Sequence, residues 1–411
     1  MGMINLKYHT GGKERIVVNL FVLQMLFSLW PWFIYFYVSG GLKLALGPSI
    51  TLLAFLVSPY SFHLTSRDVG VFLLLLIAAL LGTSGNINAY LGTILRCVPF
   101  LLFMAAKQEI RVATLESFSK WYVWILGISL LFWTLFLIGI PLPHVHLKIV
   151  DDNFYEFDNY YFFIKNTHLL FSDSFFPRFN SIFLEPGYVA CFIVLMLFGG
   201  NYDFRRLRNV IYLAALIMTF SLAGWFLFFI ALIPFLNQKG HIKWVYIVMF
   251  IGFIGIFLYL NNKSEANVVN MLIGERLRMV NGEMAGYNRA NDEIEALWRN
   301  GFLTSSDALW GLREEYYTKY DFGASVDSRA YIIRFGIIAF VFYVWFLFRS
   351  LRTKWSSRGL WIFVIVSLFV YRGYSIMFSD ALLFVYISSL EVLLLSSTSE
   401  RKKNIEPIEY P

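Results

Sequence analysis

The chain reads PRFNSIFLEPG from residue 177 to residue 187 and then continues into a long apolar run. Arg178 and Glu185 lie seven residues apart, so on a helix they would share one face, about 10 Å apart along the axis. Pro186 has no N–H to donate to the carbonyl of Ile182, and we expect that carbonyl to be free. The stretch therefore predicts an arginine, a carboxylate and a helix break at the mouth of a membrane span.

The sequence pattern places the charged Glu185 inside a membrane span, where its burial costs free energy. A glutamate about two turns inside a span costs several kcal/mol unless it is paired or faces a wet cavity. Broken backbone at membrane depth is likewise tolerated only where protein or water surrounds it. Arg178 and Glu185 are therefore candidate functional residues. The alternative is a structural pair between them that holds the outer end of the span.

The composition indicates a membrane protein with many spans. Hydrophobic residues make up 58% of the 411 residues and charged residues 15%, which is too apolar for a soluble globule. The net charge of +7 lies in short clusters between apolar runs, a placement that reports membrane orientation rather than nucleic-acid binding. Cys97 and Cys191 fall inside predicted spans, so we expect neither a disulfide framework nor a zinc or redox site.

Apolar runs long enough to cross about 30 Å of hydrocarbon recur along the chain. They lie at residues 16–38, 42–62, 69–83, 87–106, 122–140, 179–200, 209–236, 244–260, 330–348, 360–377 and 381–395. The first is long enough to remain as a span rather than a cleaved signal peptide, and 209–236 suits two short helices that turn at residues 221–224. We therefore predict an all-α polytopic integral membrane protein with about twelve transmembrane helices.

Positive charges predict the topology, because cytoplasmic loops carry the excess of lysine and arginine. With the N-terminus inside, basic clusters fall on the cytoplasmic side at residues 7–15, 67, 107–111, 205–208, 239–243, 349–358 and 401–403. A single span at 209–236 would place every later cluster outside, which is the main argument for dividing it. Both termini are thus expected in the cytoplasm.

Five segments follow from this topology. They are 1–140 with helices one to five, 141–177 as a first external loop, 178–260 with helices six to nine and the Arg178–Glu185 motif, 261–329 as a large external loop, and 330–411 with helices ten to twelve and a cytoplasmic tail. The first loop is dense in acids and rings, which suits a sugar because ring faces can lie on C–H groups while acids accept hydroxyl hydrogens. An interfacial helix packed on the bilayer is the alternative.

The large external loop carries arginines among many acids. These are Arg276, Arg278, Arg289, Arg299 and Arg313. Arginine can clamp a phosphate through two N–H groups, although solvated, salt-bridged helices account for the same mixture. Arg96 in the middle of one predicted span, and Arg372 near the outer end of another with Asp380 close by, are expected to face a polar cavity or a partner acid.

Motifs for nucleotide or metal chemistry are absent from the sequence. It has no phosphate-binding glycine loop, dinucleotide fingerprint, His-Glu-x-x-His or Asp-x-Asp, and Glu156-Phe157-Asp158 is a weak approach to an acidic metal pair. A metal-free external reaction with a phosphate leaving group would need arginines for the developing charge and a carboxylate for the acceptor's proton. Arg178 and Glu185 offer that combination.

These residues resemble a known family. The pattern Arg178-x₆-Glu185-Pro186-Gly187 at the start of a middle span, the helix pair that turns at 221–224 and the large late loop are similar to the O-antigen polymerase (Wzy-type) and ligase superfamily. Inside the loop, Arg289 nine residues before Trp298, the segment DALWG at 307–311, and Asp327 ahead of 331–338 with Gly336 follow the family's pattern.

The resemblance implies a glycosyltransferase C-like bundle with two large periplasmic loops and a site at the external face of a bacterial inner membrane. A polymerase of this family builds lipopolysaccharide O-antigen by moving the growing glycan from undecaprenyl diphosphate to the next lipid-linked repeat unit, without nucleotide sugar, metal or other cofactor. A ligase moves the finished glycan to a lipid A core. Ligases resemble one another in a histidine in the late loop, and none occurs here between residues 261 and 329, which favours a polymerase.

The same resemblance implies roles for single residues. Arg178 and Arg289 would grip the diphosphate, and Glu185 would act as the general base or orient the acceptor hydroxyl. Further substrate-binding candidates are Arg276, Arg278, Asp327, Arg372 and Arg96, with Asp292 and Asp327 as reserve bases. The expected partners are the lipid-linked donor and acceptor oligosaccharides, membrane lipid and a chain-length regulator protein, with no nucleic acid.

Three other functions remain open on the sequence. A ligase shares the fold and differs only in its acceptor. A transporter of the lipid-linked oligosaccharide could also place charges in a bundle, but the span pattern shows no inverted repeat and both large loops fall on one face, which suits chemistry there more than alternating access. A structural or assembly protein predicts that no single external arginine matters.

Overall fold

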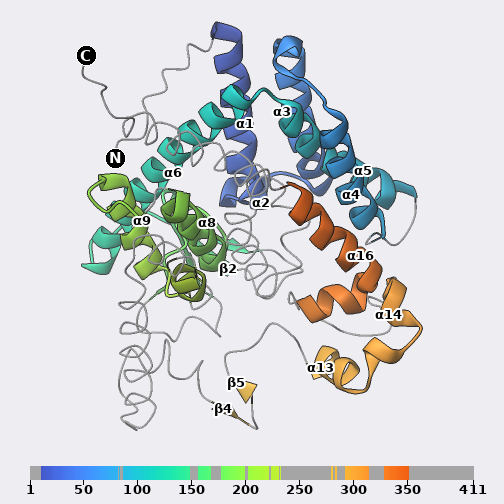
Figure 1. Ribbon diagram of the computed structural model, residues 1–411. Coiled ribbons are helices and arrows are strands. Elements are labelled where there is room, and N and C mark those ends of the chain that lie inside the picture. Colours follow the sequence, from blue (N-terminus) through green and yellow to red (C-terminus); the bar gives the residue numbers. More distant parts are fainter. Residues whose placement is uncertain are drawn as a thin grey trace, which may run out of the picture.

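The computed structural model describes residues 11–81, 83, 87–148, 156–167, 177–199, 202–221, 224–230, 232, 279–280, 283–284, 292–313 and 328–350. These residues are mostly helical (Figure 1). Four helices among them are long and apolar enough to cross a membrane: α3 (Gly40–Val57), α5 (Ile87–Ala105), α6 (Gln108–Leu137) and α16 (Ser328–Ser350). The chain is therefore a helical membrane protein, and the predicted spans at 244–260, 360–377 and 381–395 lie outside the described residues.

The first predicted span, 16–38, consists of two helices rather than one. α1 (Gly12–Ser28) ends before Trp30, which has a φ of 53°. The short α2 (Trp32–Tyr37) begins after Pro31. The break falls where a proline removes a backbone donor and restricts the residue before it.

Predicted spans two to five correspond to α3, α4 (Ser66–Leu81), α5 and α6, with a short 3-10 helix η1 (Pro59–Ser61) after α3. α6 begins at Gln108, well before the predicted start at 122. The N–H of Lys107 donates to the Ser61 carbonyl at 2.8 Å, and Arg67 Nη2 donates to the Arg349 carbonyl at 3.4 Å. These two bonds connect segments near residues 61–67, 107 and 349, whose positive charges all predict the cytoplasmic side of the membrane.

The first predicted external loop contains a small antiparallel sheet, which corrects both the all-α expectation and the interfacial helix. β1 (Val145–Lys148) pairs with β2 (Glu156–Asn159), which pairs with β3 (Ile164–Asn166). Phe157 and Ile164 pack with Leu184 into a cluster that aromatic side chains of the α1–α2 region cover. A separate two-stranded ladder joins β4 (Met279–Val280) and β5 (Glu283–Met284).

The predicted division of residues 209–236 is confirmed. α9 (Leu207–Met218) ends at Met218, and a second helix includes residues 224–230. Ser221 begins the second helix, because its Oγ accepts from the Gly224 N–H at 3.2 Å and its carbonyl accepts from the Trp225 N–H at 2.9 Å. This is the role of an N-cap serine.

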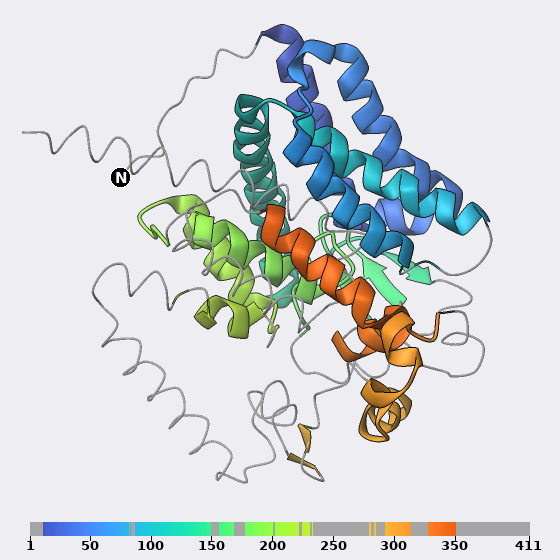
Figure 2. The ribbon, with the colours of Figure 1, turned by 45° about the vertical axis from the view of Figure 1, so that its right-hand side comes forward.

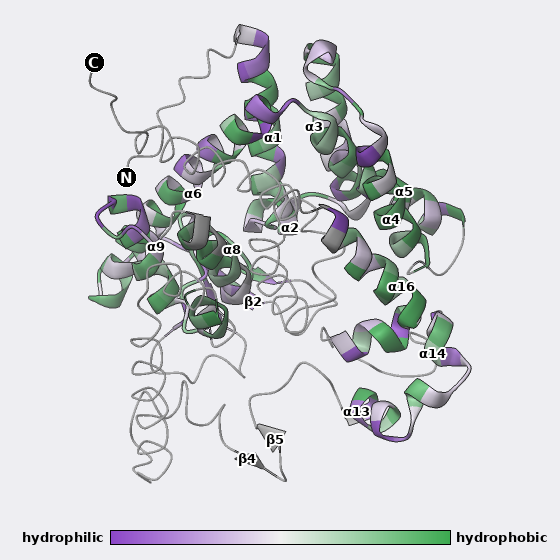
Figure 3. Ribbon diagram, viewed as in Figure 1, coloured by the Kyte–Doolittle hydropathy of each residue, from purple (hydrophilic) through white to green (hydrophobic). Residues whose placement is uncertain are grey.

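The core lies where α1, α4, α5, α6, α8 (Pro186–Gly199) and α9 meet, and it continues onto α16. α16 packs against α4, and in both ribbon views it runs between the α3–α5 group and the α8–α9 pair (Figure 2). Hydrophobic residues predominate on these helices (Figure 3). Trp133, Tyr122 and Tyr212 are among the largest completely buried side chains.

The tenth predicted span, 330–348, is broken at Gly336, whose φ and ψ are 85° and 164°. A helix interrupted there leaves the carbonyls of Ile333 and Arg334 without their usual partners four residues on. They accept instead from the N–H groups of Leu312 and Arg313, at 2.8 and 3.0 Å. The late loop is therefore joined to α16 backbone to backbone.

The part of the late loop that precedes these bonds contains α13 (Asp292–Arg299), the 3-10 helix η3 (Phe302–Thr304) and α14 (Asp307–Trp310). Ile294, Phe302 and Ala308 pack against Ala330 and Ile333 of α16 in a core of their own. After Ser306 the described chain forms one short helical turn at 307–310, followed by non-helical residues up to 313.

Gly336→Ala should lower thermal stability strongly. A Cβ at Gly336 would lie 2.3 Å from the Leu309 carbonyl oxygen, and the positive φ is unfavourable for any other residue. Backbone strain alone costs about 1–3 kcal/mol. Thermal unfolding in detergent measures the effect, with Gly127→Ala as the control, because a Cβ there meets only Ile211 Cδ1 at 3.9 Å. Equal unfolding temperatures for the two variants would contradict the backbone contact.

Candidate functional site

Residues 177–185, called the motif loop below, are not helical. The chain turns at Ser181, which has a φ of 53°, and α8 begins only at Pro186. The predictions that a span starts at 179 and that Arg178 and Glu185 share a helical face are therefore wrong. The physical reason is that proline is favoured at the first helical position, where its missing N–H costs nothing.

The end of α9 holds the first part of the motif loop. The N–H of Phe179 donates to the Met218 carbonyl at 2.9 Å, and Nε of Arg178 donates to the Thr219 carbonyl at 3.1 Å. A helix leaves its last carbonyls without partners, so the loop satisfies groups that would otherwise be exposed. The Nε bond fixes the direction in which the half-buried Arg178 side chain leaves the loop.

Ser129 of α6 joins the middle of the motif loop to the sheet region. Its hydroxyl donates to the Phe162 carbonyl at 2.6 Å and lies 2.7 Å from the Ser181 hydroxyl. Because Ser129 has one hydroxyl hydrogen, Ser181 is the donor in the second bond. The N–H of Ile164 in β3 donates to the Ser181 carbonyl at 2.9 Å. Three parts of the chain therefore meet at Ser181, which is completely buried.

Ser129→Ala should destabilise the protein by about 1–3 kcal/mol, because it removes a hydrogen-bond partner from the buried Ser181 hydroxyl and from the partly buried Phe162 carbonyl. The matched control on the same helix is Thr134→Ala, whose hydroxyl bonds only to the Leu130 carbonyl of its own helix at 2.8 Å and should stay within about 0.5 kcal/mol. Thermal unfolding of the two purified variants measures the difference. An equal effect would show that the Ser129 bonds contribute nothing specific.

The second half of the motif loop contacts α2. The Ile182 carbonyl, expected to be free, accepts from the N–H of Trp32 at 2.9 Å, and the adjacent Pro31 and Phe183 form an isolated antiparallel bridge. Four elements, α2, α6, α9 and β3, thus hold the loop. Such support from rigid neighbours is what keeps a reacting side chain in position.

Asn180 is a residue of the motif loop that the sequence reasoning missed. Its side chain is 2% exposed, and Nδ2 donates to the Leu184 carbonyl at 3.2 Å. Oδ1 is buried and has no partner among the described residues. The available signal was an asparagine followed by a serine, both turn-forming residues, inside an otherwise apolar stretch.

Glu185 precedes the first residue of α8 and is half-buried. Its carbonyl accepts from the N–H of Val189 at 3.4 Å, which gives Glu185 the N-cap position. The positive end of the helix dipole favours a carboxylate there. Glu185 therefore lies at the start of the helix, where its charge costs much less than two turns inside a span.

The other predicted site residues do not gather around the motif loop in the described part of the chain. Arg96 is exposed on α5, which packs on α3 and α4, and α16 runs between that group and α8 (Figure 2). The remaining candidates lie outside the described residues: Arg276, Arg278, Arg289, Asp327 and Arg372.

Two described arginines of the late-loop region form ion pairs with one acid. Glu295 of α13 contacts Arg299 at 3.0 Å and Arg329 of α16 at 2.9 Å. These pairs tie α13 to the start of α16. The salt-bridged interpretation of the mixed charges is thus confirmed for Arg299.

In the described parts of the first external loop, residues 141–148 and 156–167, most acids and rings contact other groups of the fold. Asp158 pairs with His146 at 3.2 Å, and Glu156 pairs with Lys148, both across the β1–β2 ladder. Phe157 and Phe163 are completely buried. Burial, and then the charge of Asp158, raise the pKa of the Tyr160 hydroxyl. Among the described phenylalanine and tyrosine rings of this loop, Tyr161 and Phe162 are exposed to a ligand such as a sugar, at 49% and 45%.

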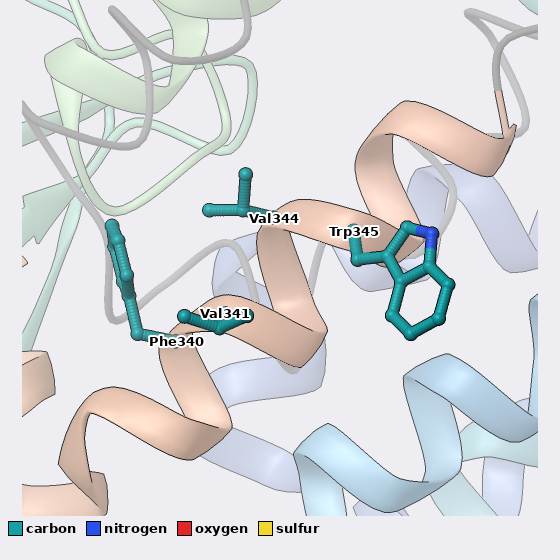
Figure 4. A pocket seen from close by; sticks show the side chains of 4 residues that line it. All are labelled: Phe340, Val341, Val344 and Trp345. Carbon is teal, nitrogen blue, oxygen red and sulfur yellow. The ribbon is translucent and has the colours of Figure 1, made fainter. Parts of the chain in front are cut away.

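A hydrophobic pocket lies on the second half of α16 (Figure 4). Phe340, Val341, Val344 and Trp345 line it, and none of them carries a titratable group. The described residues also hold no cluster of three or more His, Cys, Asp or Glu side chains that could bind a metal ion. Among the described residues the motif loop therefore remains the best candidate site.

A scan against protein-family models, a search of curated proteins and a search of solved structures each found no match to this chain.

Proposed function

We propose that the protein is a glycan polymerase of the O-antigen type, which transfers a growing chain from undecaprenyl diphosphate to the next lipid-linked repeat unit at the external face of the membrane. The observation that carries this proposal is the motif loop. It holds an arginine and a glutamate on a firmly anchored, non-helical segment at the end of a hydrophobic helix. Such a segment can meet a substrate whose lipid lies in the bilayer and whose sugar lies in water.

The proposed reaction uses the two charged residues in different roles. The acceptor hydroxyl oxygen forms a bond to the anomeric carbon of the donor, and the bond from that carbon to the phosphate oxygen breaks. The lipid diphosphate leaves with the electron pair, while the hydroxyl proton passes to Glu185. Arg178 stabilises the charge that develops on the diphosphate, as fixed donors do in water-poor sites.

Several features of the described structure support these roles. The hydrogen bond to Thr219 orients the guanidinium before substrate arrives, so little reorganisation is needed during reaction. The N-cap position of Glu185 favours the ionised form that a general base requires. Arg289, with Arg276 or Arg278, would complete the diphosphate clamp from the late loop, and Asp292 and Asp327 are the reserve bases.

Reconstitution tests the proposal directly. The purified protein is incubated in nanodiscs with the host's undecaprenyl-diphosphate-linked repeat unit, without nucleotide sugar or added metal, and lipid-linked products are separated by size. A ladder of multiples of the repeat is expected. Transfer only after lipid A core is added would indicate a ligase. Movement of the repeat unit across a vesicle membrane without any new bond would indicate a transporter.

A further inference from the structure

The segment that follows α14 contacts the first part of a candidate membrane span. The apolar window of α16, residues 328–346, has the length and composition of such a span, and it consists of two helical parts that meet at Gly336. Leu312 and Arg313 bond to Ile333 and Arg334, five and six residues into that window. Both bonds fall in the helical part that precedes Gly336, so they hold the segment against the Ser328 end of the candidate span.

Close packing as well as backbone hydrogen bonds joins the α14 region to α16. A Cβ at Gly311 would lie 2.4 Å from the Arg334 carbonyl oxygen, so the two backbones touch there. Ala308, which is 2% exposed, packs against Ala330 and Ile333. Figure 1 shows α14 beside the bend of α16. Any surface that α14 presents is therefore held at a fixed position relative to the membrane-spanning part of α16.

α14 presents large hydrophobic side chains on the side away from this core. Leu309 is 51% exposed and Trp310 is 50% exposed, whereas Ser306 and Asp307 at the start of the helix are exposed and polar. Figure 3 colours much of α14 as hydrophobic where it approaches α16. Tryptophan is enriched at membrane interfaces, where its apolar ring and polar N–H both find a partner.

Arg313 adds a positive charge directly beside the exposed indole. Its guanidinium carbon lies 5.8 Å from the centre of the Trp310 ring, and Nε donates to the Trp310 carbonyl at 3.3 Å. The Nη groups are arginine's best donors for a phosphate. An exposed leucine, a tryptophan and an arginine in this order match the gradient from hydrocarbon to phosphate headgroup.

We infer that α14 is an interfacial anchor: Leu309 and Trp310 insert into the leaflet at the Ser328 end of α16, and Arg313 binds a lipid phosphate there. The anchor fixes the late loop at the membrane surface through the Gly311–Gly336 contact. This inference concerns lipid binding and stands whether or not the chain polymerises a glycan.

Spin labels measure the insertion. Cys97 and Cys191 are buried and are replaced by alanine, and single cysteines are placed by Leu309→Cys, Trp310→Cys and the control Ser306→Cys. In phospholipid nanodiscs, labels at 309 and 310 should collide with oxygen in preference to a water-soluble nickel chelate, and the label at 306 should show the reverse. A preference for nickel at 309 and 310, or shielding from both reagents because protein covers them, would overturn the anchor.

A second comparison tests the phosphate. Arg313→Gln should make the label at 309 more accessible to nickel in phosphatidylglycerol nanodiscs. In nanodiscs of digalactosyldiacylglycerol, which has no phosphate, the same substitution should have no effect. An equal shift in both lipids would overturn the role of the phosphate. Each labelled variant must elute as a single species in detergent, so a misfolded protein is recognised before its label is interpreted.

Discussion

Arg178→Ala should abolish the ladder of lipid-linked products while the protein remains folded in the membrane. In the proposed reaction the guanidinium faces the charge that develops on the leaving diphosphate, and loss of one such donor group costs about 10²–10³ in turnover. The substitution also removes the bond from Nε to the Thr219 carbonyl. Turnover is measured with purified protein and one lipid-linked repeat unit, and thermal unfolding is measured on the same sample.

Two controls separate chemistry from folding at this position. Arg178→Lys keeps the charge but loses the planar group and its Nε bond, so we expect partial activity rather than full rescue. Arg205→Ala removes an exposed arginine of a predicted cytoplasmic cluster and should leave the ladder unchanged. A normal ladder from a folded Arg178→Ala protein would sink the assignment, and equal losses for Arg178→Ala and Arg205→Ala would point to net charge instead.

The helix pair in residues 209–236 and the contacts between certain turns agree with the charge pattern of the sequence. The division of residues 209–236 follows from the positive charges on either side, and Ser221 and Gly224 mark its turn. The contacts of Ser61 with Lys107 and of Arg67 with Arg349 join turns assigned to one side by the same rule. Charge placement predicts such features because it acts on each loop separately.

Breaks inside apolar stretches were harder to predict. Gly336 lies among hydrophobic residues, and a helix that is apolar on all sides has no periodicity from which to detect an interruption. Its conformation depends on Leu309 and Gly311, which approach from a distant part of the chain. At Trp30 and in the motif loop the signal was present, because Pro31 and Pro186 mark the breaks.

The first external loop shows how composition can hide a pattern. Residues 156–158 read Glu-Phe-Asp, which alternates polar and apolar as a half-buried strand does. The two acids point to one face, where they pair with β1, and Phe157 points into the core. Their density suggested a sugar-binding surface or an interfacial helix, whereas the structure places them in a sheet.

The supports of the candidate site could not be predicted from one sequence. Ser129 and Ser181 are 52 residues apart, and the sequence around either serine contains no motif that predicts their hydrogen bond. Arg178 and Glu185 were singled out because charged residues near a span are costly unless they are used. Residue chemistry thus selects candidate side chains, whereas their anchoring depends on tertiary contacts.

Glu185→Gln should reduce turnover by about 10²–10⁴, the range that a positioned general base contributes. The amide has nearly the same shape, and the Glu185 carbonyl still accepts from the Val189 N–H, so α8 should begin at the same residue. Stability should change little, because a neutral group at an N-cap loses only about 0.3–1 kcal/mol of dipole interaction. Single-turnover measurements with the lipid-linked repeat separate this chemical step from binding.

Glu185→Asp distinguishes a base from a residue that only orients the loop. The shorter carboxylate keeps the charge but withdraws the oxygen by one methylene, so a base should retain a fraction of turnover that the glutamine variant lacks. Glu109→Gln, at an exposed position in the first turn of α6, is the matched control and should behave as wild type. Near wild-type turnover in Glu185→Gln would leave this residue as a structural cap of α8. Asp292 and Asp327 would then be the acids to replace next, because proton removal from the acceptor hydroxyl still requires a carboxylate.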